Sequence, residues 1–86
     1  MNKKLSQHEI ILKAMLEHPE KEYWKATDFQ SGEYFVGYEA TARMSEMLSL
    51  YFPLIKIGKD GRFRTLSINW EKEEEIKFYK EKLGII

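Results

Sequence analysis

The stretch LIKIGKDGRFRTLSI, residues 54–68, decides the fold of this chain. Two β-prone runs, 54–58 and 62–68, flank a short Lys-Asp-Gly segment, and this pattern predicts a β-hairpin. Because side chains alternate between the two faces of a strand, the turn determines which residues share a face.

Two turns fit this hairpin sequence. A three-residue loop that ends with Gly61 in the left-handed conformation gives the pairs Gly58–Arg62, Ile57–Phe63 and Lys56–Arg64. It places Ile55, Ile57 and Phe63 on one face and Lys56, Arg62 and Arg64 on the other. A two-residue Asp60-Gly61 turn would instead pair Ile57 with Arg64 and so place apolar and basic residues on the same face. We therefore expect the three-residue loop and an amphipathic hairpin.

Residues 38–51, just before the hairpin, are expected to form a helix that follows Gly37 and ends at Phe52-Pro53. Its apolar residues recur at helical spacing on one face: Ala40, Met44, Met47, Leu48 and Tyr51. The opposite face has small side chains and few charges, which suits close approach to another surface. Residues 34–36 are expected to lead into this helix as an extended segment.

Two more helices are expected earlier in the chain. Ser6 and Glu9 have the spacing of a capping box, and the helix that they begin should end at His18-Pro19. Residues 23–29 are expected to form a second helix of about two turns, with Trp24 and Phe29 in the core.

A final helix is expected over residues 70–83, capped by Asn69 and ended by Gly84. Glutamates at its start and lysines near its end complement the helix dipole. Ile76, Tyr79 and Leu83 form an apolar stripe, and Phe78 lies off that stripe. An apolar residue left over after the core is covered indicates a partner, so we expect a homodimer through this helix, involving Ile76, Phe78, Tyr79 and Leu83.

The composition is that of a single folded domain, with 43% hydrophobic and 14% aromatic residues among 86. The absence of cysteine excludes disulfides and thiolate zinc sites, and no apolar run is long enough to span a bilayer. The N-terminus lacks a signal-peptide pattern, so we expect a cytoplasmic protein. The formal net charge is zero, yet four cations fall between residues 56 and 64.

No catalytic, metal or cofactor motif is present in the sequence. His8 and His18 are ten residues apart without a third ligand at useful spacing, and no nucleophile elbow or phosphate-binding loop occurs. We therefore expect no enzyme, no metal, no cofactor and no small-molecule ligand.

The expected order is helix, short helix, helix, hairpin, helix: an α+β fold with the plan of a winged helix. The segment GYEATARMSEM, residues 37–47, resembles the recognition helix of small winged helix-turn-helix proteins encoded by phages and prophages. These often have an Ala-Arg-x-Ser-Glu/Asp-Leu stretch before a short basic hairpin, and Ala42–Met47 followed by GKDGRFR (residues 58–64) matches it. The resemblance covers roughly residues 6–68. It implies a regulatory protein that binds double-stranded DNA, with the third helix in the major groove and the hairpin on the backbone.

The resemblance and the charge pattern together predict the DNA-binding residues: Tyr38, Thr41, Arg43, Ser45, Lys56, Lys59, Arg62 and Arg64. Each prediction has an alternative. Arg43 can pair with Glu39 or Glu46 within its own helix, and the basic hairpin can serve as charged protection of a strand edge. Phe63, Met44 and Met47 are expected to pack in the core. A winged helix that binds only another protein is the second hypothesis.

Overall fold

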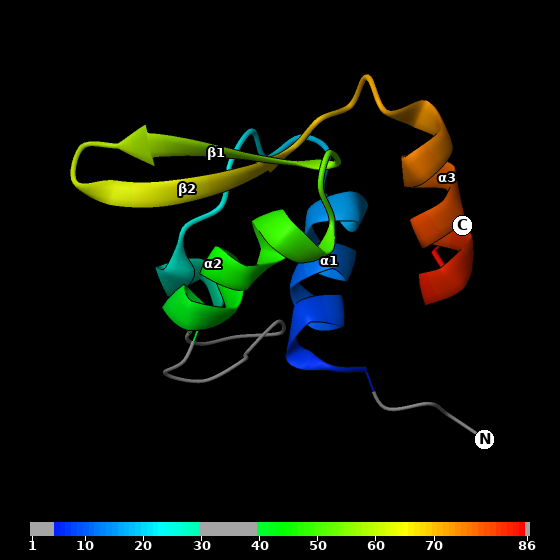
Figure 1. Cartoon of the computed structure of the whole chain (residues 1–86), viewed down its shortest axis with the longest axis horizontal. Helices are drawn as coiled ribbons and strands as arrows, with labels where there is room; N and C mark the ends of the chain where they lie inside the picture. Colours follow the sequence, from blue (N-terminus) through cyan, green and yellow to red (C-terminus); the bar gives the residue numbers. More distant parts are fainter. Residues whose placement is uncertain (1–4, 30–39, 86) are drawn as a thin grey trace.

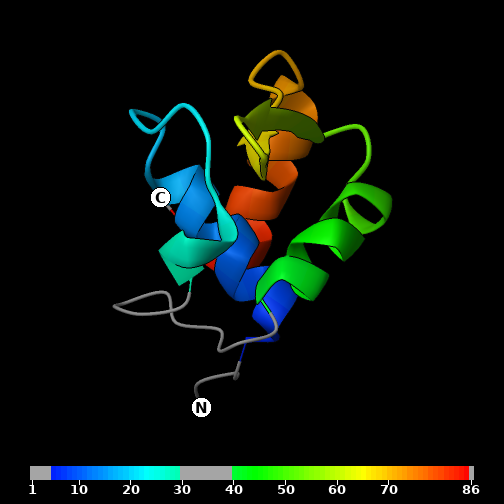
Figure 2. The same ribbon diagram turned by 90° about the vertical axis from the view of Figure 1, so that its left-hand side faces the viewer.

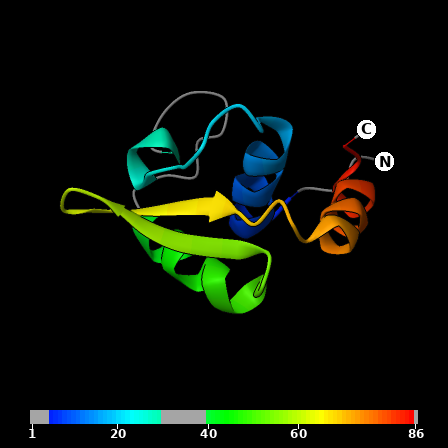
Figure 3. The same cartoon turned by 90° about the horizontal axis from the view of Figure 1, so that it is seen from above.

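The computed structural model describes residues 5–29 and 40–85, and within them the chain has an α+β fold (Figure 1). The elements in order are α1 (Gln7–Glu17), the 3₁₀ turn η1 (Ala26–Phe29), α2 (Ala40–Leu50), β1 (Ile55–Asp60), β2 (Phe63–Ile68) and α3 (Glu73–Leu83). Helix α1 lies in the middle, α3 lies at one end, and the hairpin extends over α2 toward the other end (Figures 1 and 3). The expected fold class is confirmed, and the order of elements is compatible with the winged-helix plan.

Helix α1 begins and ends where the sequence predicts. The Ser6 hydroxyl accepts from the Glu9 amide (3.2 Å), and the Glu9 carboxylate accepts from the Ser6 amide (2.9 Å). The helix stops at Glu17, before His18-Pro19. Only residues close in sequence are involved, so the capping box alone fixes this end of the helix.

The core is built around α1, with the largest fully buried side chains of the other elements packed on it. Those of α1 are Ile11, Leu12, Met15 and Leu16, and the others are Phe29, Met47, Leu54 and Leu66. Trp24 stacks on Phe29 with 5.2 Å between ring centroids. The core positions expected for Trp24, Phe29, Met44 and Met47 are confirmed.

The expected helix over residues 23–29 is wrong in its first half. Trp24 exchanges two backbone hydrogen bonds with Leu66 of β2, of 2.8 and 2.9 Å, and so runs as an extended segment beside the hairpin. Only Ala26–Phe29 is helical, where the Asp28 carboxylate accepts from the Lys25 amide (2.8 Å). The open edge of β2 supplies hydrogen-bond partners that a helix at Trp24 could not use.

The hairpin register is also different from the expected one. The turn has two residues, Gly61 and Arg62, and Gly61 alone has a positive φ, of 64°. The observed pairs are Ile55–Ile68, Lys56–Ser67, Ile57–Leu66, Gly58–Thr65, Lys59–Arg64 and Asp60–Phe63. Lys59 and Arg64 thus share one face with Ile57, while Phe63 shares the other face with Lys56 and Asp60.

The expected core position of Phe63 is therefore wrong, because 54% of this side chain is exposed. The base of the hairpin explains the register. Ile55, Leu66 and Ile68 come together on one face and are all buried. Burial of these three large aliphatic side chains stabilises the observed register more than a separation of apolar from basic side chains at the exposed tip would.

Helix α2 is described from Ala40 to Leu50, and the expected helix start, with Gly37 and the extended residues 34–36, lies outside the described residues. Helix α3 begins three residues later than its expected start at Trp70. Asn69 instead forms a local turn, in which its side chain accepts from the Glu71 amide (3.3 Å) and its carbonyl from the Lys72 amide (3.0 Å). Gly84 ends α3 as expected.

The apolar stripe of α3 packs against the protein's own core. Ile76 and Leu83 are buried and Tyr79 is partly buried, whereas 58% of the Phe78 side chain is exposed. Of the four residues expected at a dimer surface, Phe78 is thus the exposed one, and the homodimer stays a prediction. Among the described residues, no helix has the length and apolar character needed to cross a membrane.

Candidate nucleic-acid interface

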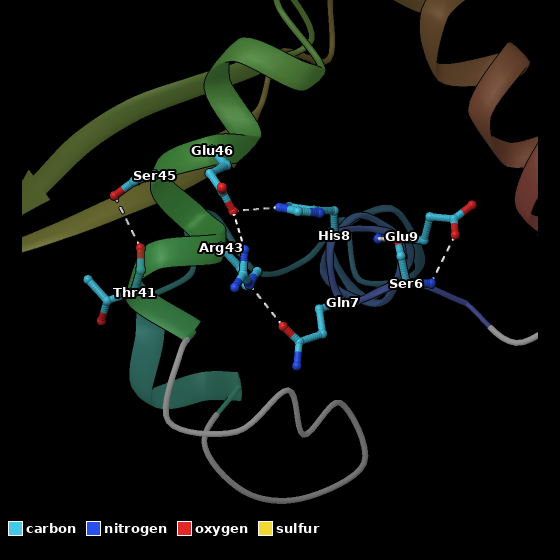
Figure 4. A network of polar contacts seen from close by, with 8 residues as sticks. All are labelled: Ser6, Gln7, His8, Glu9, Thr41, Arg43, Ser45 and Glu46. Carbon is cyan, nitrogen blue, oxygen red and sulfur yellow. Dashed lines mark hydrogen bonds and ion pairs between the residues drawn. The ribbon is translucent and has the colours of Figure 1, made fainter.

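Seven of the eight predicted site residues lie in the described part of the chain, and Tyr38 lies outside it. Thr41 and Ser45 are exposed on the side of α2 away from α1 (Figure 4). Lys59, Arg62 and Arg64 surround the turn of the hairpin. The structure therefore brings five of the predicted residues to one side of the molecule.

A concave site of about 610 Å³ lies between η1, α2 and the hairpin turn. Figure 2 views this side of the molecule, with the hairpin above and with η1 and α2 on either side. The lining residues are Lys25, Ala26, Thr27, Thr41, Met44, Lys59, Arg62, Phe63 and Arg64. Residues 62–64 form one wall, so side chains from both faces of the hairpin reach the site.

A direct contact joins the hairpin to α2. Arg64 donates from Nη1 to the Ser45 hydroxyl (3.0 Å), and that hydroxyl donates to the Thr41 carbonyl (3.1 Å). The two contacts hold the guanidinium of β2 against the exposed side of α2. Helix and hairpin consequently form one continuous surface.

The concave site is positively charged. Lys59 and Arg64 are directly opposite each other across the hairpin, an arrangement that is unfavourable for like charges. Within residues 5–29 and 40–85, no carboxylate lies within ion-pair distance of Lys59, Arg62 or Arg64. An anion bound between Lys59 and Arg64 would relieve their repulsion.

A fourth cation, Lys25, has its charge balanced by the hairpin. Its Nζ lies 3.2 Å from the Asp60 carboxylate, which also accepts from the Tyr23 hydroxyl (3.1 Å). The hydrogen bonds from Lys25 and Tyr23 lower the pKa of Asp60. These contacts hold the hairpin tip against the segment before η1, so the site has a fixed wall on this side.

Arg43 is directed toward α1 and away from the concave site (Figure 4). Its Nη1 lies 2.6 Å from the Glu46 carboxylate, and its Nε donates to the Gln7 side chain (2.9 Å). His8 Nε2 lies 2.9 Å from the same Glu46 oxygen. The hydrogen bonds from His8 and Arg43 lower the pKa of Glu46. Arg43 thus links α2 to α1, and the intrahelical pair with Glu46 is present.

Lys56 lies on the hairpin face opposite to Lys59 and Arg64, because of the register. Five lining residues are not among the predicted site residues, and Lys25 and Phe63 are the two of these that carry a charge or an aromatic ring. Lys25 was assigned to a helix, although the aromatic pair before it is typical of a strand. Phe63 was assigned to the core on the basis of the three-residue loop.

The described residues contain no group of three histidine or acidic side chains that could hold a metal ion. Compared with protein-family models, curated proteins and solved structures, the chain matches none.

Proposed function

We propose that this protein binds double-stranded DNA as a winged helix of the phage regulatory type, acting in transcription regulation in the cytoplasm. Helix α2 would enter the major groove and the hairpin turn would lie on the adjacent backbone. The observation that carries the proposal is the Arg64–Ser45 contact, since it places the hairpin cations, which have no carboxylate partner among residues 5–29 and 40–85, beside the exposed side of α2.

The exposed side of α2 suits a groove. Eleven residues give a helix about 16 Å long, and the major groove is about 12 Å wide. Thr41, Ala42, Ser45 and Ser49 are exposed and small, so the helix backbone can approach the base edges. Hydroxyl groups can also hydrogen-bond to either bases or phosphates.

Glu46 is the one carboxylate among residues 40–50, and it is paired with Arg43 and His8. This pairing weakens the repulsion that a free glutamate would exert on phosphates. The neutral net charge of the chain is therefore compatible with a locally positive surface.

Backbone amide shifts during titration with a mixed-sequence duplex test the proposal. We expect shifts in residues 40–46 and 56–64, which weaken in Arg62→Ala and persist in Lys77→Ala, a matched loss of an exposed cation on α3. Shifts confined to α3, or no shifts, would contradict DNA binding.

A second candidate is association of two copies through α3. Glu74, Phe78 and Lys82 are exposed and follow one another at intervals of four residues, so they form one ridge. When two copies of this ridge pack antiparallel, each Glu74 meets the partner's Lys82, and the two Phe78 rings meet at the centre. The ridge is therefore complementary to itself. Charge complementarity thus favours a second copy as the occupant of this face.

Sedimentation over a range of protein concentrations tests the association. We expect Phe78→Asp and Lys82→Glu to be monomeric, and the double variant Glu74→Lys/Lys82→Glu to recover association. A chain that stays monomeric at every concentration rules the second candidate out.

A further inference from the structure

The concave site has an apolar wall that contact with a phosphate does not require. Phe63 lines it with about half of its side chain exposed, beside Met44 and Ala26. Phe63 lies two residues after Gly61, at the start of β2, and the backbone pairing with Asp60 fixes its position. An exposed aromatic ring next to unpaired cations is the combination found in sites that bind single-stranded nucleic acid.

The size of the site also indicates a ligand larger than a phosphate group. Its volume of about 610 Å³ lies within the range of roughly 300–1,000 Å³ that is usual for sites that enclose a small molecule. The cations Lys59, Arg62 and Arg64 lie at the same end of the hairpin as Phe63, in the turn or next to it. A ligand with an anionic group and a planar apolar group would use both parts of the site.

We propose that the concave site binds one unpaired nucleotide, with its phosphate against Lys59, Arg62 and Arg64 and its base on the Phe63 ring. This proposal rests on the proposed function, because it takes nucleic acid as the ligand. It adds that the site prefers a base that is not stacked in a duplex. Thr41 lines the same site, so a nucleotide held there lies beside the DNA-facing side of α2.

The contacts around Phe63 support this use of the ring. The Lys25 ammonium lies 5.7 Å from the ring centroid, within the reach of a cation–π contact, and Asp60 balances its charge. Lys25 thus lies over one face of the ring with its charge balanced, and a base would stack on the opposite face. Since every base has an apolar face, the site should accept bases with little sequence preference.

Fluorescence anisotropy with three labelled DNA probes tests the proposal: a short perfect duplex, the same duplex with one extra unpaired thymidine, and the corresponding single strand. We expect the wild-type protein to bind the bulged duplex more tightly than the perfect one. Phe63→Leu keeps an apolar side chain but removes the ring, and it should weaken binding to the bulged duplex about 5- to 150-fold, the effect of losing one stacked base. Binding to the perfect duplex should not change.

Phe52→Leu is the matched control, because it changes an exposed phenylalanine that lies outside the concave site. It should bind all three probes as the wild type does. Competition distinguishes a free nucleotide from a nucleotide within a strand. If thymidine 5′-phosphate displaces the bulged probe far better than inorganic phosphate or thymidine does, the site also binds free nucleotides. Displacement only by oligonucleotides supports a nucleotide within a strand.

The outcomes also separate this proposal from the proposed function. Equal affinity for perfect and bulged duplexes, unchanged in Phe63→Leu, overturns the nucleotide site and leaves duplex binding intact. Binding to the single strand that depends on Phe63, without binding to the perfect duplex, supports the nucleotide site and overturns the duplex proposal. No binding to any probe overturns both.

Discussion

The salt dependence of duplex binding follows from the number of unpaired cations at the concave site. Lys59, Arg62 and Arg64 have no carboxylate partner in the described part of the chain, whereas Lys25 is balanced by Asp60. Each phosphate neutralised contributes about −0.9 to the slope of log affinity against log salt. Three contacts therefore predict a slope of about −2.7 for the wild-type protein.

Arg64→Ala should reduce the slope to about −1.8. Between 50 and 200 mM salt, the wild-type affinity would fall about 40-fold and that of the variant about 12-fold. The assay is anisotropy of a labelled duplex at a series of salt concentrations, with circular dichroism to confirm that each variant is folded.

Two further variants separate charge from hydrogen bonding. Arg64→Lys keeps the charge but cannot reproduce the guanidinium contact with Ser45, so its affinity should fall while its slope stays at about −2.7. Lys77→Ala removes an exposed cation from α3 and should leave slope and affinity unchanged. An Arg64→Ala slope equal to that of the wild type would refute the assignment of this residue to the phosphate contacts.

Three predictions concern the fold. Ser6→Ala removes the side-chain cap of α1 and should lower the free energy of unfolding by about 1 kcal/mol in urea titrations, with Ser49→Ala as a control at an exposed serine outside a cap. Gly61→Ala forces a residue with a Cβ to a φ of 64° and should cost about 1–2 kcal/mol, less in Gly61→Asn; equal stability of all three would contradict the turn. The contacts from His8 and Arg43 lower the pKa of Glu46 below 4.5, so the stability that they contribute is present above pH 4.5 and is lost as the pH falls through the folded-state pKa. Glu46→Gln should flatten this part of the acid unfolding curve, and an unchanged curve would contradict the pairing.

The parts of the fold that were predicted correctly depend on neighbours in sequence. The capping box at Ser6, the stop before Pro19 and the end of α3 at Gly84 each involve residues within one helical turn. Helix α2 was also found, since the spacing of Ala40, Met44 and Met47 reflects burial against α1 and the hairpin. Local chemistry and periodicity are sufficient for such elements.

The errors arise where a distant segment changes a local preference. Trp24 is extended because Leu66, far along the chain, offers it two backbone hydrogen bonds. Arg43 is held by Gln7, 36 residues earlier, and by Glu46, which His8 also contacts. The sequence around Trp24 and Arg43 does not identify Leu66 and Gln7 as their partners. The pair of Arg43 with Glu46, by contrast, follows from their spacing in one helix.

The hairpin register has the largest consequence for function. The observed pairing differs by three residues from the expected one, and an odd shift exchanges the faces of one strand relative to the other. Arg64 thereby meets α2 from the same hairpin face as Lys59, and Phe63 becomes exposed beside Lys25. The expected register would have given a purely basic face suited to phosphates alone. The observed one gives a site with both cations and an aromatic ring.

One residue pair shows why the observed register is compatible with this sequence. Gly58 lies opposite Thr65, whose side chain is buried, and a Cβ at position 58 would come within 2.9 Å of the Thr65 hydroxyl oxygen. A side chain opposite Thr65 would have to displace this hydroxyl, which favours Gly58 at this level of the hairpin. A one-residue slip would bring Ile57 or Lys59 there, and either side chain would press on the buried threonine. The glycine that the sequence suggested as the end of a strand thus fixes the pairing that brings Lys59, Phe63 and Arg64 into one site.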